Sequence, residues 1–172
     1  MRTWGQNKSG GKSLWWPVIA RNKRSLTLNL KAKDGLDVFK KLVAQSDVVV
    51  ENYRPDVKHR LGIDFESLRK VNPRLVYGSS SGYGKSGPYR DYPAMDLVMQ
   101  AMSGVIDSTG HPDQPPVKAG PAICDFSAGI HLYAAIMTAL YERERSRRRS
   151  STGRRATVQR HTNTGMSTAA MA

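Results

Sequence analysis

The fold of this chain is decided by residues 34–50, which read DGLDVFKKLVAQSDVVV. Apolar residues recur at helical spacing in the first part of this stretch, which predicts a helix over residues 35–45 with one buried face. The residues of that face are Leu36, Phe39, Leu42 and Val43. The β-branched run 48–50 follows directly and is typical of a parallel strand buried on both faces. The stretch therefore predicts an α/β fold with parallel strands and covering helices.

Two further strands are expected on either side of this unit. Residues 25–30 read SLTLNL and alternate apolar with polar residues, the period of a half-buried strand. Residues 75–77, LVY, follow the helix-stopping pair Asn72-Pro73. We therefore expect parallel strands near residues 26–30, 47–51 and 75–78.

Capping signals and apolar spacing predict four more helices. Pro55 suits the first turn of a short helix that ends at Gly62, and Asp64 can cap another that runs through Leu68. A helix over residues 94–106 and a longer one over residues 125–145 follow. The residues expected to be buried are Leu97, Val98, Ala101, Met102 and Val105 in the first of these two, and Ile130, Ala134, Met137 and Leu140 in the second.

Residues 78–93 form a loop rich in Gly, Ser and Tyr that is too long for a bare connector, so it is a candidate functional loop. Residues 82–87 satisfy GxGxxG, a pattern of dinucleotide sites, and residues 78–82 satisfy GxSxG, a pattern of hydrolase nucleophiles. Both sites need a helix directly after the pattern. Pro88 and further loop residues follow instead, so we do not favour either site.

The chain has 172 residues and a net charge of +13, which raises the question of nucleic-acid binding. The excess lies at the two ends: residues 1–33 carry eight Lys or Arg and no acid, and residues 146–172 carry six Arg and no acid. Residues 34–145 hold 13 basic and 14 acidic residues and are essentially neutral. We therefore expect no specific nucleic-acid partner, and a basic nucleic-acid-binding protein is the less favoured alternative.

Size and composition also bound the compartment and the number of domains. A chain of 172 residues is about one domain or a piece of a larger protein. The N-terminus has no apolar signal region, and no apolar run approaches the roughly 18 residues of a membrane span, so we expect no membrane partner. Cys124 is the one cysteine and cannot form an internal disulfide, which favours a reducing, cytoplasmic setting.

Cys124 and the adjacent Asp125 are the two candidate nucleophiles of this sequence. His131 lies seven residues after Cys124, about two helical turns away, which is poor for direct contact, so we interpret Cys124 as a small buried hydrophobe. Asp125 lies between a Pro-rich loop and the long helix, where free N–H groups and the helix dipole keep a carboxylate ionised. By this reasoning alone, Asp125 is either an ordinary cap or a functional carboxylate. No His, Cys, Asp or Glu group has metal-ligand spacing, so we expect no metal.

Several motifs, taken in order, resemble the family III CoA-transferases, the CaiB/BaiF family that includes formyl-CoA transferase, carnitine CoA-transferase and α-methylacyl-CoA racemase relatives. They are NKRSLTLNL at 22–30, DVVVENYRP at 47–55, SGYG at 81–84, GPY at 87–89, Asp96, QAMSG at 100–104, Thr109-Gly110, Pro115-Pro116, Asp125 and the helix ending in Arg143. The resemblance covers about residues 2–145. It implies that this part of the chain belongs to the large Rossmann-like domain of the family.

The resemblance implies transfer of CoA from an acyl-CoA thioester to a free small carboxylic acid. The catalytic aspartate of the family falls on Asp125, which would form aspartyl anhydride and aspartyl-CoA intermediates. Coenzyme A would be present as the acyl-CoA substrate. The positions that match its contacts are Leu28, Lys31, Asn52, Tyr53, Arg60, Leu61 and Asp96.

The same resemblance includes a second activity. The racemases of the family use a histidine directly before the position of Asp96, and that residue is Met95 here. Methionine cannot accept a proton at neutral pH, so the transferase interpretation is preferred and a racemase-like enzyme is the alternative.

The resemblance also implies a longer protein. Complete members have a large and a small domain and form homodimers of interlocked chains, and Arg2 matches family sequence well downstream of the family start. We therefore expect residues 1–145 to be a partial large domain and residues 146–172 a basic tail that is disordered or out of frame. An inactive truncated fragment is a further alternative.

Overall fold

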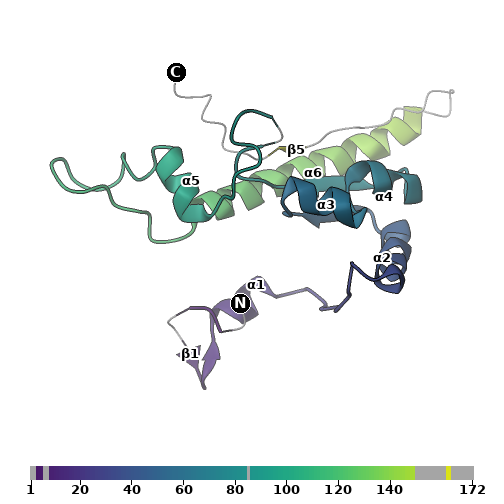
Figure 1. Ribbon diagram of the computed structural model, residues 1–172, viewed down its shortest axis with the longest axis horizontal. Helices are drawn as coiled ribbons and strands as arrows, with labels where there is room; N and C mark the ends of the chain where they lie inside the picture. The colour runs from purple at the N-terminus through teal and green to yellow at the C-terminus, as the bar shows by residue number, and fades with distance from the viewer. Residues whose placement is uncertain (1–2, 6–7, 85, 150–161, 164–172) are drawn as a thin grey trace.

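The computed structural model describes residues 3–5, 8–84, 86–149 and 162–163 (Figure 1). The elements in chain order are β1 Lys8–Ser9, β2 Lys12–Ser13, α1 Trp15–Ile19, α2 Lys33–Gln45, β3 Val48–Glu51, α3 Pro55–Leu61, α4 Phe65–Val71, β4 Val76–Ser79, α5 Asp96–Met102, α6 Ile123–Arg149 and β5 Thr162–Asn163. The sheet order is β3-β4-β5, and both pairs are parallel. The predicted α/β class is confirmed.

The unit β3-α3-α4-β4 forms as its local signals predict. Pro55 is the first residue of α3, and the helix ends at Gly62, whose φ of 67° is in the left-handed region. The Asp64 carboxylate accepts a hydrogen bond from the Ser67 backbone N–H at 3.1 Å and so caps α4. These signals act within one or two turns, so the bounds of α3 and α4 follow from sequence alone.

One face of the β3-β4 pair is covered by α2, α3 and α4. Val43 of α2, Leu68 of α4 and Tyr77 of β4 are buried together there. The Tyr77 hydroxyl donates to the Ile63 carbonyl at 3.0 Å. Burial, and secondarily Glu51, raises the pKa of Tyr77 far above its usual value, which keeps the phenol a neutral donor. This cluster is the core of the described part of the chain.

The opposite face of β4 is covered by α6, which passes behind α3 and α4 in Figure 1. Tyr77 and Gly78 point to opposite faces because successive strand residues alternate. A Cβ placed on Gly78 would lie 3.0 Å from Ile136 Cδ1 and 3.2 Å from Leu132 Cδ1. The helix therefore packs directly on the glycine backbone.

The far end of α6 is fixed by Arg143. Its Nη2 lies 2.6 Å from Asp47 Oδ1, at the start of β3, and its Nη1 donates to the Arg74 carbonyl at 3.0 Å, just before β4. The helix thus runs antiparallel to the strands. Its first turn, with Asp125, lies at their carboxyl ends.

The buried faces of two helices differ from the sequence prediction. In α6, Leu132 is 7% exposed and Ala139 is buried, whereas Ile130 is 67% exposed and Met137 is also exposed. Apolar residues occur on every side of this helix, so the spacing of apolar residues alone could not predict which side packs against Gly78. In α5, the prediction chose Leu97 and Met102, which are exposed, while Met99 and Gln100 are buried.

Two further expectations are wrong. Residues 25–30 have no regular structure in the described part of the chain, and Leu26 is 62% exposed. An alternating pattern becomes a strand only where a neighbouring backbone supplies hydrogen bonds. Leu42 of α2, expected to be buried, is also exposed.

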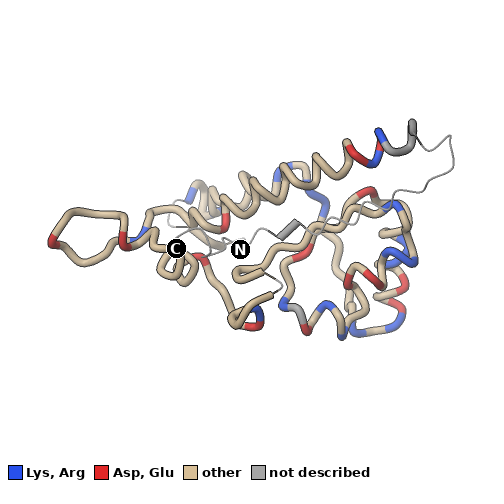
Figure 2. The backbone as a smooth tube through the Cα atoms, turned by 90° about the horizontal axis from the view of Figure 1, so that it is seen from above, with Lys and Arg blue, Asp and Glu red and all other residues tan. Residues whose placement is uncertain are grey.

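The long helix continues past its predicted end near residue 145, because α6 ends at Arg149. Most of the expected 146–172 tail, residues 150–161 and 164–172, lies outside the described residues. Within α6, residues Ile123–Arg145 are long and apolar enough to cross a membrane, contrary to the sequence expectation. A helix in the core of a protein can be equally long and apolar. Figure 2 shows that α6 carries no charged residue along most of its length.

The contact at Gly78 gives a stability prediction. We expect Gly78→Val to lower the free energy of unfolding by about 1–3 kcal/mol, because its methyl groups overpack against Leu132 and Ile136. The measurement is urea denaturation followed by circular dichroism. Gly129→Ala is the control: a Cβ there meets nothing within 4 Å, so a gain of up to about 1 kcal/mol is expected. Equal stability of Gly78→Val and wild type would contradict the packing described.

Candidate active site

A cavity of about 130 Å³ lies where the carboxyl ends of β3 and β4 meet the first turns of α5 and α6. In parallel α/β folds, ligands bind at this edge of the sheet. The lining residues are Asn52, Ser80, Ser81, Gly82, Ala94, Met95, Met99, Cys124, Asp125 and Ala128. Polar side chains such as Asn52 and Asp125 lie there beside the apolar Met95 and Met99, which suits a small polar group joined to a short acyl chain.

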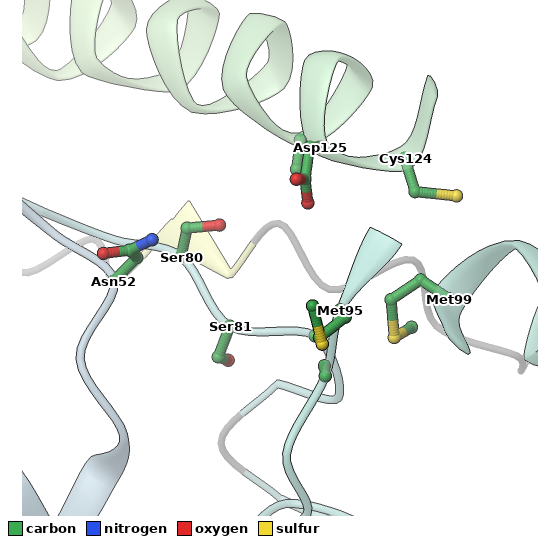
Figure 3. A pocket seen from close by; sticks show the side chains of 10 residues that line it. Asn52, Ser80, Ser81, Met95, Met99, Cys124 and Asp125 are labelled. Atoms are coloured by element: carbon green, nitrogen blue, oxygen red, sulfur yellow. The ribbon is translucent and has the colours of Figure 1, made fainter. Parts of the chain in front are cut away.

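Asp125 is the acidic residue of this lining. It is the third residue of α6, and its side chain points from the helix into the cavity, toward the wall that carries Asn52 and Ser80 (Figure 3). The sequence placed Asp125 at the start of the helix as a possible cap. The position at the helix start is confirmed, but the capping role belongs to another residue.

The first turn of α6 is capped by Asp96, from the first turn of α5. Asp96 Oδ1 accepts the backbone N–H of Cys124 at 2.9 Å and that of Asp125 at 3.1 Å. A carboxylate at this place satisfies two N–H groups that the helix itself leaves unpaired. The Asp125 side chain is thereby left to face the cavity.

This arrangement changes the electrostatics expected for Asp125. Partial burial, and secondarily the negative charge of Asp96, raises the pKa of Asp125 above its usual value. The sequence reasoning, in which the helix start stabilises the ionised form, is wrong in direction because it left out the partial burial of Asp125 and, secondarily, the charge of Asp96. A poorly solvated carboxylate beside another is a stronger base and nucleophile when ionised.

The Cys124 side chain points in a different direction from that of Asp125 and is more buried. It is buried, and its sulfur points away from Asp125 in Figure 3. Burial, and secondarily Asp96, raises the pKa of the Cys124 thiol, which disfavours a thiolate. His131 Nδ1 lies 2.8 Å from the Ser127 carbonyl oxygen. These contacts favour the interpretation of Cys124 as a small buried hydrophobe.

The opposite wall of the cavity rests on a buried ion pair. Lys58 Nζ donates to Glu51 Oε1 at 2.9 Å and to Ser79 Oγ at 3.0 Å, and Glu51 and Ser79 lie opposite each other in the sheet. Glu51 Oε2 also accepts the Tyr53 backbone N–H at 2.8 Å. The pair therefore fixes the chain directly before the two lining residues Asn52 and Ser80. Sequence reasoning did not find it, because nothing local marks Glu51 and Lys58 as partners.

The glycines of the 82–87 pattern have structural roles. A Cβ on Gly82 would collide with Ala94 Cβ, and Gly84 and Gly87 have φ values of 79° and 92°. The same loop gathers Tyr83, Tyr89 and Tyr92, with ring centroids 5.3–6.5 Å apart. The pattern thus reflects loop geometry, as its sequence context indicated.

Of the residues matched to coenzyme A, Asn52 lines the cavity with Asp125, and Asp96 lies behind Asp125. Tyr53 directly follows Asn52 and is exposed. The others lie outside the cavity: Leu28 on the irregular segment before α2, Lys31 in the turn that leads into α2, exposed Arg60 near the end of α3, and Leu61 packed against the core. Arg60 Nη1 lies 3.8 Å from Asp56 Oδ2. Among the described residues, no three His, Cys, Asp or Glu side chains gather as a metal site.

Comparison with curated proteins finds CoA-transferases. An acetyl-CoA:oxalate CoA-transferase of Acetobacter aceti is 45% identical over 138 residues, which are 80% of this chain and 36% of that protein. A succinyl-CoA–D-citramalate CoA-transferase of Chloroflexus aurantiacus is 40% identical over 146 residues, 85% of this chain and 36% of the relative. The chain thus spans about a third of the length of these relatives.

Solved structures agree with this comparison. A CAIB/BAIF family protein from Brucella suis aligns with a TM-score of 0.78 at 37% identity, over 84% of this chain and 39% of that one. A hypothetical protein from Mycobacterium tuberculosis aligns with a TM-score of 0.68 at 33% identity, over 73% of this chain and 36% of that one. The family described as CoA-transferase family III matches residues 1–169. The chain belongs to CoA-transferase family III.

Proposed function

We propose that this protein moves CoA from an acyl-CoA thioester to a free carboxylic acid, with Asp125 as the nucleophile. The observation that carries the proposal is the Asp125 carboxylate, which points into a small cavity at the carboxyl edge of the sheet and has a raised pKa. Family membership supports the reaction class. The named relatives above act on oxalate and citramalate, so we propose a dicarboxylic acid as acceptor.

In the first half of the proposed reaction, an Asp125 oxygen attacks the thioester carbonyl carbon. The carbon–sulfur bond breaks, CoA leaves as the thiolate, and an aspartyl-acyl anhydride remains. The thiolate then attacks the Asp125 carbonyl carbon of the anhydride. The donor acid leaves as its carboxylate, and Asp125 is left as the aspartyl-CoA thioester.

The second half reverses these steps with the acceptor acid. Its carboxylate attacks the aspartyl-CoA carbonyl, which expels the thiolate and forms a second anhydride. The thiolate attacks the acyl carbon that came from the acceptor, so the new acyl-CoA forms and the Asp125 carboxylate is regenerated. No net proton or electron transfer is needed.

Each attack places negative charge on a carbonyl oxygen, which needs hydrogen-bond donors nearby. The Asn52 amide and the hydroxyl groups of Ser80 and Ser81 line the cavity with Asp125. We propose that the Asn52 side-chain amide donates to this oxygen, because the buried Glu51–Lys58 pair holds the chain directly before it.

Racemisation is less well supported by the same cavity. A racemase of this type needs a second proton acceptor, and the residue at the matching position, Met95, also lines the cavity. A thioether cannot accept a proton at neutral pH. Homodimerisation, a cytoplasmic location and the absence of membrane and nucleic-acid partners remain predictions.

We propose that CoA extends from the cavity past Tyr53 toward α3 and the segment before α2. Tyr53 offers an exposed ring for the adenine or pantetheine, and Lys31 and Arg60 offer exposed charges for the phosphates. Leu28, Leu61 and Asp96 complete the proposed set of CoA-binding residues. Asp96 would act indirectly, because its carboxylate accepts the backbone N–H groups of Cys124 and Asp125. The cavity itself would hold the thioester end.

The nucleophile assignment predicts the loss of transfer in Asp125→Asn. The amide keeps the shape but cannot form the anhydride, so the rate should fall by at least about 1,000-fold. The assay mixes the chain with acetyl-CoA or succinyl-CoA and with oxalate or citramalate, and follows new acyl-CoA by chromatography. Asp37→Asn, on an exposed position of α2, is the matched control and should keep wild-type activity. Full turnover by Asp125→Asn would overturn the assignment.

The CoA path predicts weaker CoA binding in Arg60→Ala. Loss of one exposed phosphate contact should raise the dissociation constant about three- to tenfold, with a smaller effect at high salt. Isothermal titration with CoA measures this. Arg69→Ala is the control because Arg69 is also exposed on a short helix and pairs with a neighbouring acid, Glu66, at 3.5 Å. Equal affinities of the two variants would exclude Arg60 from the site.

A further inference from the structure

Gln100 is a buried polar residue to which neither the QAMSG motif of the sequence analysis nor the proposed reaction gives a role. It lies on α5, one turn after Asp96, and is 1% exposed. Its neighbours along α5 are the apolar residues Met99 and Ala101. Burying an amide costs free energy unless its donors and acceptor are all paired, so its partners indicate its role.

All the groups around the Gln100 amide agree on one orientation. Gln100 Nε2 donates to Asp96 Oδ2 at 2.6 Å and to the Pro121 carbonyl at 3.4 Å. Gln100 Oε1 accepts the Ala119 backbone N–H at 2.8 Å. The reverse orientation would face a donor with a donor and acceptors with an acceptor. The amide therefore ties α5 to the loop that leads into α6.

Asp96 links the Gln100 amide to the first turn of α6, which carries Asp125. Gln100 holds Oδ2 of its carboxylate, and Oδ1 accepts the backbone N–H groups of Cys124 and Asp125. With both oxygens engaged, the carboxylate plane of Asp96 cannot turn without breaking a hydrogen bond. The start of α6 is thus held both by Asp96 and by the loop that Gln100 binds.

We propose that Gln100 is a positioning residue that, through Asp96, sets the place of Asp125 in the cavity. This proposal rests on the proposed function. Gln100 does not line the cavity, and it acts only through the Asp96 carboxylate and the loop residues Ala119 and Pro121. Its loss should therefore reduce the rate of the chemical step while leaving CoA binding intact.

The first test replaces Gln100 with Met, which keeps the volume but makes none of these hydrogen bonds. We expect kcat for CoA transfer to fall about 10- to 100-fold, because displacing a reacting group by about 1 Å can cost up to about 100-fold. KM for acyl-CoA should stay within about twofold of wild type. Gln45→Met, at the exposed end of α2, is the matched control and should change neither constant. Wild-type kcat in Gln100→Met, or a loss confined to KM, would overturn the proposal.

The second test does not depend on turnover. Amide hydrogen exchange should accelerate in Gln100→Met at Cys124 and Asp125, whose N–H groups bind Asp96, and stay unchanged in the core strand β4. Unchanged exchange at these two amides, or a uniform increase over the whole chain, would also overturn the proposal. If the wild type transfers no CoA, the proposed function fails, and the exchange result still decides the positioning role.

A third test exchanges the donor and the acceptor of the Gln100–Asp96 hydrogen bond and asks whether the double variant recovers activity. In Asp96→Asn, a new donor faces the Gln100 donor, and turning the Gln100 amide only moves the conflict to the Ala119 N–H. In Gln100→Glu, two carboxylate oxygens meet at the 2.6 Å contact. The double variant Asp96→Asn with Gln100→Glu restores one donor and one acceptor, so its kcat should exceed that of either single variant. A double variant no better than the singles would contradict positioning by this hydrogen bond.

Discussion

The missing side chain at Gly78 is the constraint on which the described architecture depends. Because Leu132 and Ile136 reach within 3.0–3.2 Å of where a Cβ would stand, α6 lies directly on β4. Arg143 fixes the other end of the helix at the starts of β3 and β4. The antiparallel course of α6 then brings Asp125 to the carboxyl edge of the sheet, beside Asn52 and Ser80. A contact between a helix and a glycine thus determines where the proposed nucleophile stands.

Two polar pairs hold the walls of the cavity, one a buried ion pair and the other a partly buried hydrogen bond. The Glu51–Lys58 pair fixes the wall formed by Asn52 and Ser80, and the Gln100–Asp96 pair fixes the wall formed by Asp125. Buried pairs of this kind add little net stability, because desolvation offsets their attraction, but removing one partner costs about 3–5 kcal/mol for an ion pair. Their main effect is geometric, because each pair fixes the position of the cavity-lining residues next to it.

Local signals in the sequence predicted local structure well. Pro55, Gly62 and Asp64 set the bounds of α3 and α4, and the β-branched run set β3. The buried faces of α5 and α6 and the fate of residues 25–30 could not be predicted, since they depend on which surface packs against them. The family resemblance selected Asp125. The capping by Asp96 could not be predicted, and neither could the direction of the Asp125 pKa, because partial burial and the neighbouring carboxylate both depend on how the helices pack in space.

Covalent labelling of the nucleophile tests the central claim most directly. The 172-residue chain is incubated with acyl-CoA and then with hydroxylamine, which attacks an activated aspartyl carbonyl and leaves a hydroxamate on the side chain. Digestion and mass spectrometry locate the modified residue. We expect hydroxamate on Asp125, dependent on acyl-CoA and absent from the Asp125→Asn variant. Modification of Cys124 or of another carboxylate instead would contradict Asp125 as the residue that carries the acyl and CoA groups.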